Sequence, residues 1–206
     1  MPHFRLTGAI LMAAGVLSGC KSDRPSPQAD ASTPPAESPN TPNTVNVTAK
    51  DFAFEAPAQV PAGAIKFELV NQGKEFHQAQ LVKLEDGKTL KDLAKAMSTP
   101  GPTPSWLKFV GGPNGIAPGG NANSIANLTP GQYAYLCLIP STDGVMHLAK
   151  GMARPFEVTA ASSATPAELP AADVTIKLVD YDFQLSQPLT PGRHTILIDN
   201  AGPQAH

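Results

Sequence analysis

The chain has 206 residues, of which 15 are Lys or Arg and 17 are Asp or Glu, giving a net charge of −2. Charged residues make up 16% of the sequence and form no basic run, so the composition argues against nucleic acid or a strongly charged protein as a partner. The length is sufficient for one full domain and part of another.

The N-terminus carries an apolar stretch that is too short to span a bilayer. This stretch covers residues 8–17 and ends in Leu17-Ser18-Gly19-Cys20. The four residues resemble the lipobox of bacterial lipoprotein signal peptides, which implies cleavage before Cys20 and acylation of that cysteine. The expected product is an extracytoplasmic lipoprotein, periplasmic or on the cell surface, that a lipid anchor holds on the membrane. The alternative is an ordinary secretory signal in which Cys20 is incidental.

Two segments rich in Pro, Ser and Ala divide the rest of the chain. Residues 20–43 lack apolar periodicity and cannot bury enough surface to offset the entropy of ordering, which predicts a disordered tether. Residues 161–172 have a similar composition and predict a linker. The expected organisation is therefore a signal peptide over 1–19, the tether, a folded domain over 44–160, the linker, and a further segment over 173–206.

The segment from residue 44 to residue 160 contains short runs in which apolar and polar residues alternate. Pro and Gly turns separate these runs, which is typical of an all-β sandwich or barrel. The expected strands cover residues 45–49, 52–54, 65–69, 76–84, 124–128, 133–137 and 156–158.

One helix is expected to interrupt the strands. Thr89 and Asp92 resemble the two partners of a capping box, with Asp in place of Glu. The apolar residues that follow recur at helical spacing: Leu90, Leu93, Ala94 and Met97. A long loop follows over residues 98–120. We expect the helix and this loop to form an insertion that covers the core at one end of the sandwich.

The sequence also contains an internal repeat. Asp51-Phe52-Ala53-Phe54 matches Asp182-Phe183-Gln184-Leu185, and from Gly63 and Gly192 onward the two copies keep one register. Asn71 then matches Asn200, and His77 matches His206.

The second copy is incomplete in this sequence. It contains the first strands of a sandwich but nothing equivalent to Cys137, His147 or Met152, so His206 is not expected to form a second metal site. A segment this short buries little surface alone. We expect either a loosely ordered hairpin or strands docked on the edge of the first domain. The open strand edge also predicts self-association.

Four residues of the first domain are candidates for metal binding. If Cys20 carries lipid, Cys137 is left without a disulfide partner in an oxidising compartment, where a free thiol is a liability unless it is buried or bound to metal. His77 lies before it in the sequence, and His147 and Met152 lie after it. Each residue alone is also compatible with an ordinary place in the core.

The pattern formed by these residues resembles the cupredoxins, the blue copper proteins of the plastocyanin and azurin type. One histidine follows an Asn-x-Gly turn, a Gly-x-Tyr-x-Tyr-x-Cys stretch ends at Cys137, and a second histidine and a methionine follow. The resemblance covers about residues 44–160 and implies a Greek-key β-sandwich that carries one type 1 copper. It implies His77, Cys137 and His147 as equatorial ligands and Met152 as the weak axial ligand.

The residue types agree with that chemistry. Thiolate and thioether suit Cu(I), imidazole also suits Cu(II), and a site tolerated by both oxidation states serves single-electron transfer or copper holding. No catalytic constellation accompanies the candidate ligands, and the redox partner cannot be named from the sequence. Zinc is less suitable because methionine is a poor zinc ligand, and the His-x-His pairs of multicopper oxidases are absent. A metal-free cupredoxin-like module for binding or adhesion is the alternative.

Overall fold

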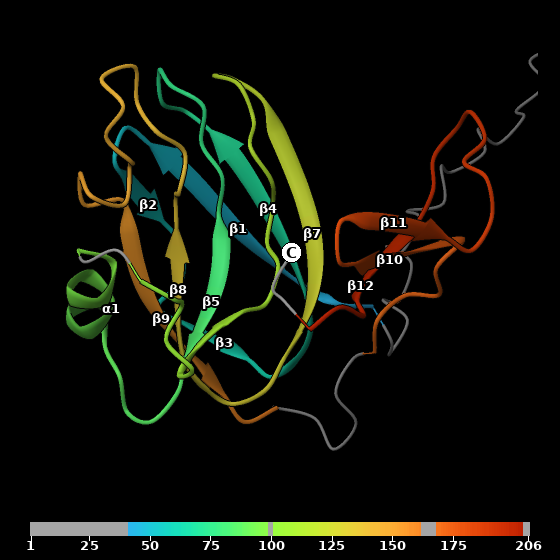
Figure 1. Cartoon of the computed structure of the whole chain (residues 1–206), viewed down its shortest axis with the longest axis horizontal. Helices are drawn as coiled ribbons and strands as arrows, with labels where there is room; N and C mark the ends of the chain where they lie inside the picture. The colour runs from blue at the N-terminus through green and yellow to red at the C-terminus, as the bar shows by residue number, and fades with distance from the viewer. Residues whose placement is uncertain (1–40, 99–100, 162–167, 204–206) are drawn as a thin grey trace, which may run out of the picture. The chain divides into compact units, whose positions relative to one another are not determined.

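The computed structural model describes residues 41–98, 101–161 and 168–203 (Figure 1). The predicted signal peptide, Cys20, almost all of the tether and His206 lie outside these ranges. Within the described ranges, the first domain contains nine strands: β1 (Asn43–Lys50), β2 (Ala53–Glu55), β3 (Gln59–Pro61), β4 (Gly63–Asn71), β5 (Gln80–Leu84), β6 (Leu107–Phe109), β7 (Asn121–Leu128), β8 (Gly131–Leu136) and β9 (Ala153–Thr159).

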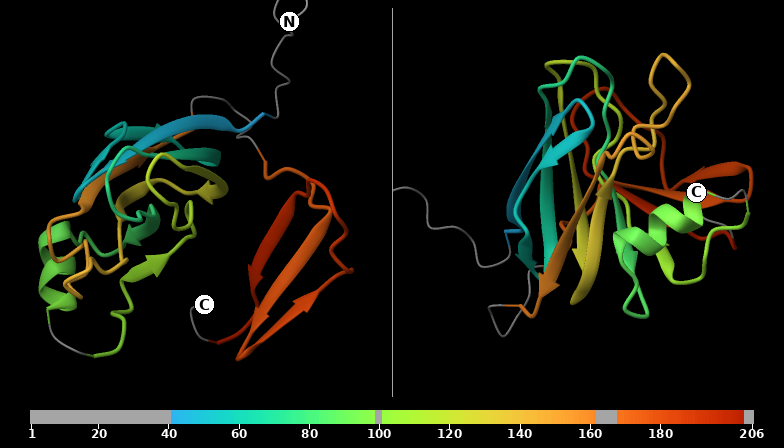
Figure 2. Two further views of the ribbon diagram at one scale, coloured as in Figure 1. Left: turned by 90° about the horizontal axis from the view of Figure 1, so that it is seen from above. Right: turned by 90° about the vertical axis from the view of Figure 1, so that its left-hand side faces the viewer.

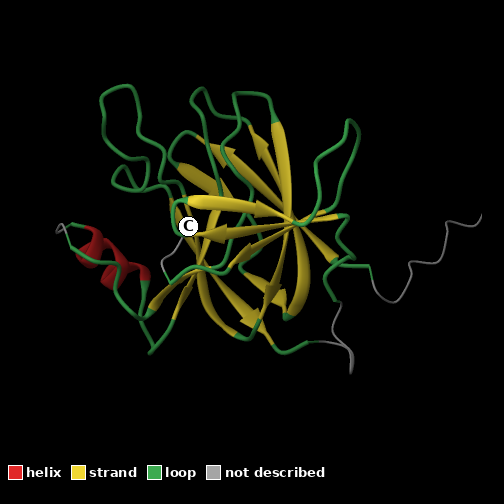
Figure 3. Cartoon of the chain, turned by 45° about the vertical axis from the view of Figure 1, so that its right-hand side comes forward, coloured by secondary structure: helices red, strands yellow, loops and turns green. Residues whose placement is uncertain are grey.

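These strands form two sheets, between which the chain passes repeatedly. One sheet has the order β2-β1-β4-β7 and the other has the order β3-β9-β8-β5-β6. β1 pairs in parallel with β4, and β3 pairs in parallel with β9, while the remaining pairs are antiparallel. The predicted all-β Greek-key sandwich is thus confirmed, and strands dominate the described ranges (Figure 3).

The core lies between the two sheets because each strand turns alternate side chains toward the other sheet. In β1 the inward residues Val45, Val47 and Ala49 are buried. From the opposite sheet, Tyr135 stacks on Phe156 with ring centroids 4.4 Å apart. Cys137 and Met152 belong to the same buried cluster, so two of the candidate ligands are continuous with the core.

The predicted helix is present as α1 (Leu90–Met97), and its capping box is complete. Thr89 accepts a hydrogen bond from the backbone N–H of Asp92, whose carboxylate accepts one from the backbone N–H of Thr89. No helix in the described ranges is long and apolar enough to cross a membrane.

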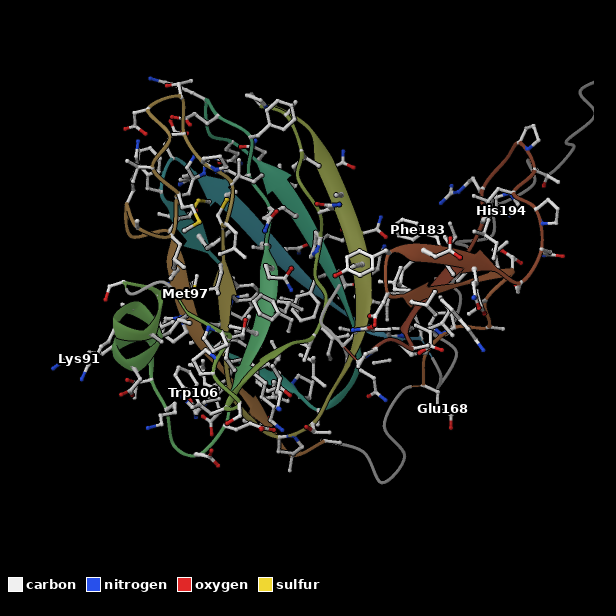
Figure 4. All side chains as sticks on the ribbon, in the orientation of Figure 1. Lys91, Met97, Trp106, Glu168, Phe183 and His194 are labelled. Carbon is white, nitrogen blue, oxygen red and sulfur yellow. The ribbon has the colours of Figure 1, made fainter. Side chains whose placement is uncertain are left out.

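The position of the helix differs from the prediction. Its buried residue Leu93 packs with Val82 and Leu136 on the outer face of the second sheet, not over an end of the sandwich, and Trp106 joins this cluster (Figures 2 and 4). The reason is that β5 and β8 carry apolar side chains on both faces, so the outer face also needs a cover.

Three strand assignments also change. β3 and β6, each of three residues, were not predicted because alternation needs a longer run to be recognised. The run over residues 76–84 is a strand only from Gln80. His77 instead forms an isolated bridge with Ile116.

A third sheet contains β10 (Val174–Val179), β11 (Asp182–Leu185) and β12 (Ile196–Asn200), in the order β11-β10-β12. Its pairings repeat those of β2-β1-β4. Residues 48 and 55 pair in the first domain, and residues 177 and 184 pair here, so both partners are shifted by 129 positions. The parallel pair of residues 45 and 67 recurs with the same shift as residues 174 and 196.

This pairing corrects two predictions. A shift of 129 matches Asp51 with Asp180, not with Asp182, and the positive φ of Phe52 (62°) recurs at Tyr181 (63°). The segment is also a hydrogen-bonded sheet of its own, neither a hairpin nor an addition to the edge of another sheet. The parallel pairing of β10 with β12 provides the third strand that a hairpin lacks.

Candidate metal centre

Three predicted ligands converge on one point inside the first domain. Nδ1 of His77 lies 3.1 Å from Nδ1 of His147, and Sγ of Cys137 lies 3.3 Å from Nδ1 of His147 and 4.0 Å from Nδ1 of His77. All three side chains are fully buried. Residues separated by up to 70 positions in the sequence thus bring two ring nitrogens and one sulfur to a shared centre.

His77 is held by backbone hydrogen bonds on both sides of its bridge. Its N–H donates to the carbonyl of Ile116 at 3.2 Å, and the N–H of Ile116 donates to the carbonyl of His77 at 2.9 Å. These bonds fix the loop before β5 against a segment that the sequence placed in the long insertion. One side of the insertion therefore supports the first ligand.

The residues between Cys137 and His147 form a small hairpin. Pro140 and Met146 form a bridge at its neck. Below the neck, the N–H of His147 donates to the carbonyl of Ile139 at 2.9 Å, and the N–H of Leu148 donates to the carbonyl of Cys137 at 2.8 Å. The hairpin projects the additional residues outward, so the long ligand loop still returns His147 to the cysteine.

Met152 is fully buried and joined to both neighbouring ligands through its backbone. Its N–H donates to the carbonyl of His147 at 2.9 Å, and its carbonyl accepts the N–H of Cys137 at 3.2 Å. The methionine thus lies immediately before β9, at the same end of the core as the other candidates.

Two carboxylates determine which nitrogen of each histidine faces the centre. Nε2 of His77 lies 3.3 Å from Oδ1 of Asp51, and Nε2 of His147 lies 3.0 Å from Oε2 of Glu75. An ionised carboxylate can only accept, so each Nε2 carries the proton and donates it. In the neutral imidazoles, both Nδ1 lone pairs then point at each other and at the cysteine sulfur.

This arrangement fits a metal cation. Burial raises the pKa of the Cys137 thiol and lowers the pKa of His77, so both groups resist charge on their own. The pKa of Asp51 is lowered chiefly by the backbone N–H of Lys74, and the pKa of Glu75 is lowered chiefly by its hydrogen bond with His147. Two inward Nδ1 lone pairs and the thiol form a donor set for one cation, and two imidazoles with one thiolate are ligands that copper accepts.

The ligand set and the strand order together decide the fold type. The domain is cupredoxin-like. No protein-family model and no curated protein matches the sequence. Among solved structures, dithionite-reduced auracyanin from the photosynthetic bacterium Roseiflexus castenholzii has a TM-score of 0.41 and 21% identity, over 57% of this chain and 97% of its own.

Two further solved structures are similar at the same level. Auracyanin A, a "blue" copper protein from the green thermophilic photosynthetic bacterium Chloroflexus aurantiacus, has a TM-score of 0.37 and 16% identity, over 58% of this chain and 99% of its own. The copper protein rusticyanin has a TM-score of 0.35 and 23% identity, over 58% of this chain and 80% of its own.

Two functional residues were missing from the sequence-based site. Glu75 is two positions from His77, but a lone acidic residue in a loop gives no periodic signal. Asp51 was noted only as a marker of the repeat. Asp51 lies in the turn between β1 and β2, where Phe52 has a positive φ, and no pattern in the sequence pairs this turn with the histidine loop.

Proposed function

We propose that this chain is an extracytoplasmic one-electron carrier with a single type 1 copper site, held on a membrane by a lipid on Cys20. The observation that carries the proposal is the convergence of one thiol and two imidazole Nδ1 atoms in a fully buried centre. A copper ion bound by these residues would supply a Cu(II)/Cu(I) couple. His77, Cys137 and His147 would hold the ion.

The role of the protein is to keep the ligands in place while the charge of the centre changes. Backbone hydrogen bonds tie His77 to Ile116, His147 to Ile139 and Met152 to His147. A rigid ligand set suits both oxidation states and keeps the rearrangement on electron transfer small. Met152 would add a weak thioether ligand, and its burial and its backbone hydrogen bonds with His147 and Cys137 support this role.

The partner is proposed to be another redox protein that docks beside the histidines. The chain neighbours of the two histidine ligands are exposed apolar residues, with Phe76 at 55% and Met146 at 37% exposure. Such side chains suit a weak and rapidly exchanging interface. The lipobox-like Leu17-Ser18-Gly19-Cys20 and the Pro-rich residues 20–43 support an anchor and a tether that leave this surface free to meet its partner.

The proposal is tested by adding Cu(II) to the metal-free protein and recording the visible spectrum. An intense thiolate-to-copper charge-transfer band should appear, and Cys137→Ser should abolish it while circular dichroism remains unchanged. His194→Asn is the matched control, because this part-buried histidine lies in the loop before β12, outside the three converging residues, and would report adventitious copper. A folded wild-type protein without the band would favour the metal-free binding module instead.

The anchor has a separate test. Cys20→Ala should move the protein from the membrane fraction to the soluble extracytoplasmic fraction and abolish incorporation of labelled fatty acid. Membrane association that survives this substitution would contradict the lipid assignment without affecting the copper assignment.

A further inference from the structure

We propose that Asp51 and Glu75 are positioning residues of the metal centre, which aim both histidine ligands and lower the reduction potential of the bound copper. The inference rests on the proposed function, because it concerns the same site. Asp51 and Glu75 are not ligands themselves, but they act on the ligands and lower the reduction potential.

Each carboxylate contacts one ligand histidine. Asp51 Oδ1 lies 3.3 Å from Nε2 of His77, and Glu75 Oε2 lies 3.0 Å from Nε2 of His147. The histidine side chains have no exposed surface, whereas the Asp51 and Glu75 side chains are 33% and 30% exposed. The carboxylates therefore lie between the buried imidazoles and solvent, and water does not compete for the Nε2 protons.

The Asp51 carboxylate is held by a backbone hydrogen bond, and Glu75 is held through the backbone of its loop. Asp51 accepts the backbone N–H of Lys74 at 2.7 Å. The loop that carries Glu75 is fixed by the buried side chain of Asn71, which donates to the carbonyl of Glu75 at 2.8 Å and accepts the N–H of Gly73 at 2.8 Å. A charge held in this way does not have to reorganise when the copper changes oxidation state.

Gly73 is the residue that allows the approach of Asp51 to His77. A Cβ at position 73 would lie 2.5 Å from Oδ1 of Asp51 and 2.5 Å from Nε2 of His77. Both distances are far below van der Waals contact. Glycine at this position is therefore required for the contact between the carboxylate and the ligand.

The charges give the direction of the effect. The thiolate of Cys137 and the carboxylates of Asp51 and Glu75 place three negative charges around the cation. Their attraction is greater for Cu(II) than for Cu(I), because it scales with the charge of the ion. Hydrogen bonding to a carboxylate also makes an imidazole a stronger donor. Both effects stabilise the oxidised state and lower the reduction potential.

The test uses substitutions that keep a hydrogen-bond acceptor and remove the charge. Glu75→Gln and Asp51→Asn should each lower the ratio of Cu(II) affinity to Cu(I) affinity about tenfold, which corresponds to a rise of about 59 mV in the one-electron potential. Asp143→Asn is the matched control, because it removes one negative charge from the ligand hairpin but Asp143 pairs with Lys150 and contacts no ligand. Potentials are measured by redox titration of the charge-transfer band.

The positioning role has a readout that does not depend on copper. In the metal-free wild-type protein, ¹⁵N NMR should find the proton of both imidazoles on Nε2, and Glu75→Ala should redistribute it at His147 only. Gly73→Ala keeps every charge but separates Asp51 from His77, so it should redistribute the proton at His77 alone. Glu75→Asp, which keeps the charge, should retain most of the wild-type potential.

The outcomes separate this inference from the proposed function. A wild-type protein without the charge-transfer band overturns both. A normal band, with potentials in Glu75→Gln and Asp51→Asn that move no more than in Asp143→Asn, overturns this inference alone. If the charge-neutral variants do not fold, a proton on Nδ1 of either histidine in the wild-type protein overturns it as well.

Discussion

Tyr133 and Tyr135 are adjacent inward-facing residues of β8, and both are buried, but their hydroxyl groups differ. The hydroxyl of Tyr133 donates to the backbone carbonyl of Thr129 at 2.8 Å. The hydroxyl of Tyr135 has no hydrogen-bond partner among the described residues, and burial raises its pKa. The two tyrosines lie on the same face of β8, but burial of the hydroxyl is compensated by a hydrogen bond only in Tyr133.

We expect Tyr135→Phe to leave the free energy of unfolding unchanged or to raise it, because it removes an unpaired buried hydroxyl. The matched Tyr133→Phe should lower it by about 1 kcal/mol, the usual net contribution of one hydrogen bond. Urea denaturation of the metal-free protein measures both. Equal losses in the two variants would show that the hydroxyl of Tyr135 has a partner, such as an ordered water.

The methionine assignment is tested at the same scale. Met152→Leu should retain the charge-transfer colour, because the thiolate is unchanged, and should raise the reduction potential, because Cu(II) loses an axial donor. Met146→Leu is the control, since Met146 is exposed in the same loop. An unchanged potential in Met152→Leu, with the protein folded, would contradict the axial role.

At the scale of elements, the hairpin between Cys137 and His147 allows a long loop without changing the position of His147. Its neck is the bridge between Pro140 and Met146, and the bonds that hold His147 and Leu148 lie below that neck. Residues 142–144 form the exposed tip, whereas Ser141 is buried. The tip is therefore not needed to place the ligand.

We expect the copper colour and affinity to survive replacement of residues 142–144 by Asn-Gly, the two-residue turn that best closes a hairpin. The bonds from His147 to Ile139 and from Leu148 to Cys137 would remain. Visible absorption and a copper titration provide the measurement. Loss of the band in a variant with unchanged circular dichroism would mean that the tip itself holds His147 in place.

How far the sequence predicted these elements depends on whether the determining interactions are local or distant. α1 was predicted because Thr89, Asp92 and the apolar positions lie within one short segment. The equatorial ligands were found because their residue types and order match a known pattern. β3 and β6 were missed because three-residue strands are specified by their partners across the sheet. Asp51 and Glu75 were missed because their role arises only when β1 and the loop before β5 meet in space.

At the scale of the whole molecule, the third sheet has one apolar and one polar face. The apolar positions of the first domain recur 129 residues later, and the equivalents of buried Phe54 and Leu69 are Phe183, at 70% exposure, and Ile198, at 55%. Figure 4 labels Phe183 on β11. In the sandwich, such a face is covered by a second sheet. Within the described residues, β11 and β12 are the edges of this three-stranded sheet.

An apolar face bounded by open edges promotes pairing between molecules. We propose that the chain self-associates through this sheet at high concentration. Ile198→Lys should shift the protein toward the monomer in analytical ultracentrifugation without changing the copper spectrum. Lys91→Glu, on the first-domain helix, is the charged control. A monomer at all concentrations in the wild-type protein would exclude this surface.

The domain boundary is tested by limited proteolysis. Residues 161–172 have the composition of a linker, and residues 44–160 contain every copper ligand and both sheets of the sandwich. Cleavage should therefore occur first within 161–172 and yield a resistant fragment that retains the charge-transfer band, because no ligand is lost. The fragment that carries β10, β11 and β12 should be degraded faster, since a three-stranded sheet with one exposed apolar face opens more readily than a closed sandwich. If both parts resist equally, or if the fragment over 44–160 loses copper, then the third sheet contributes to the stability of the metal centre and the proposed boundary is wrong.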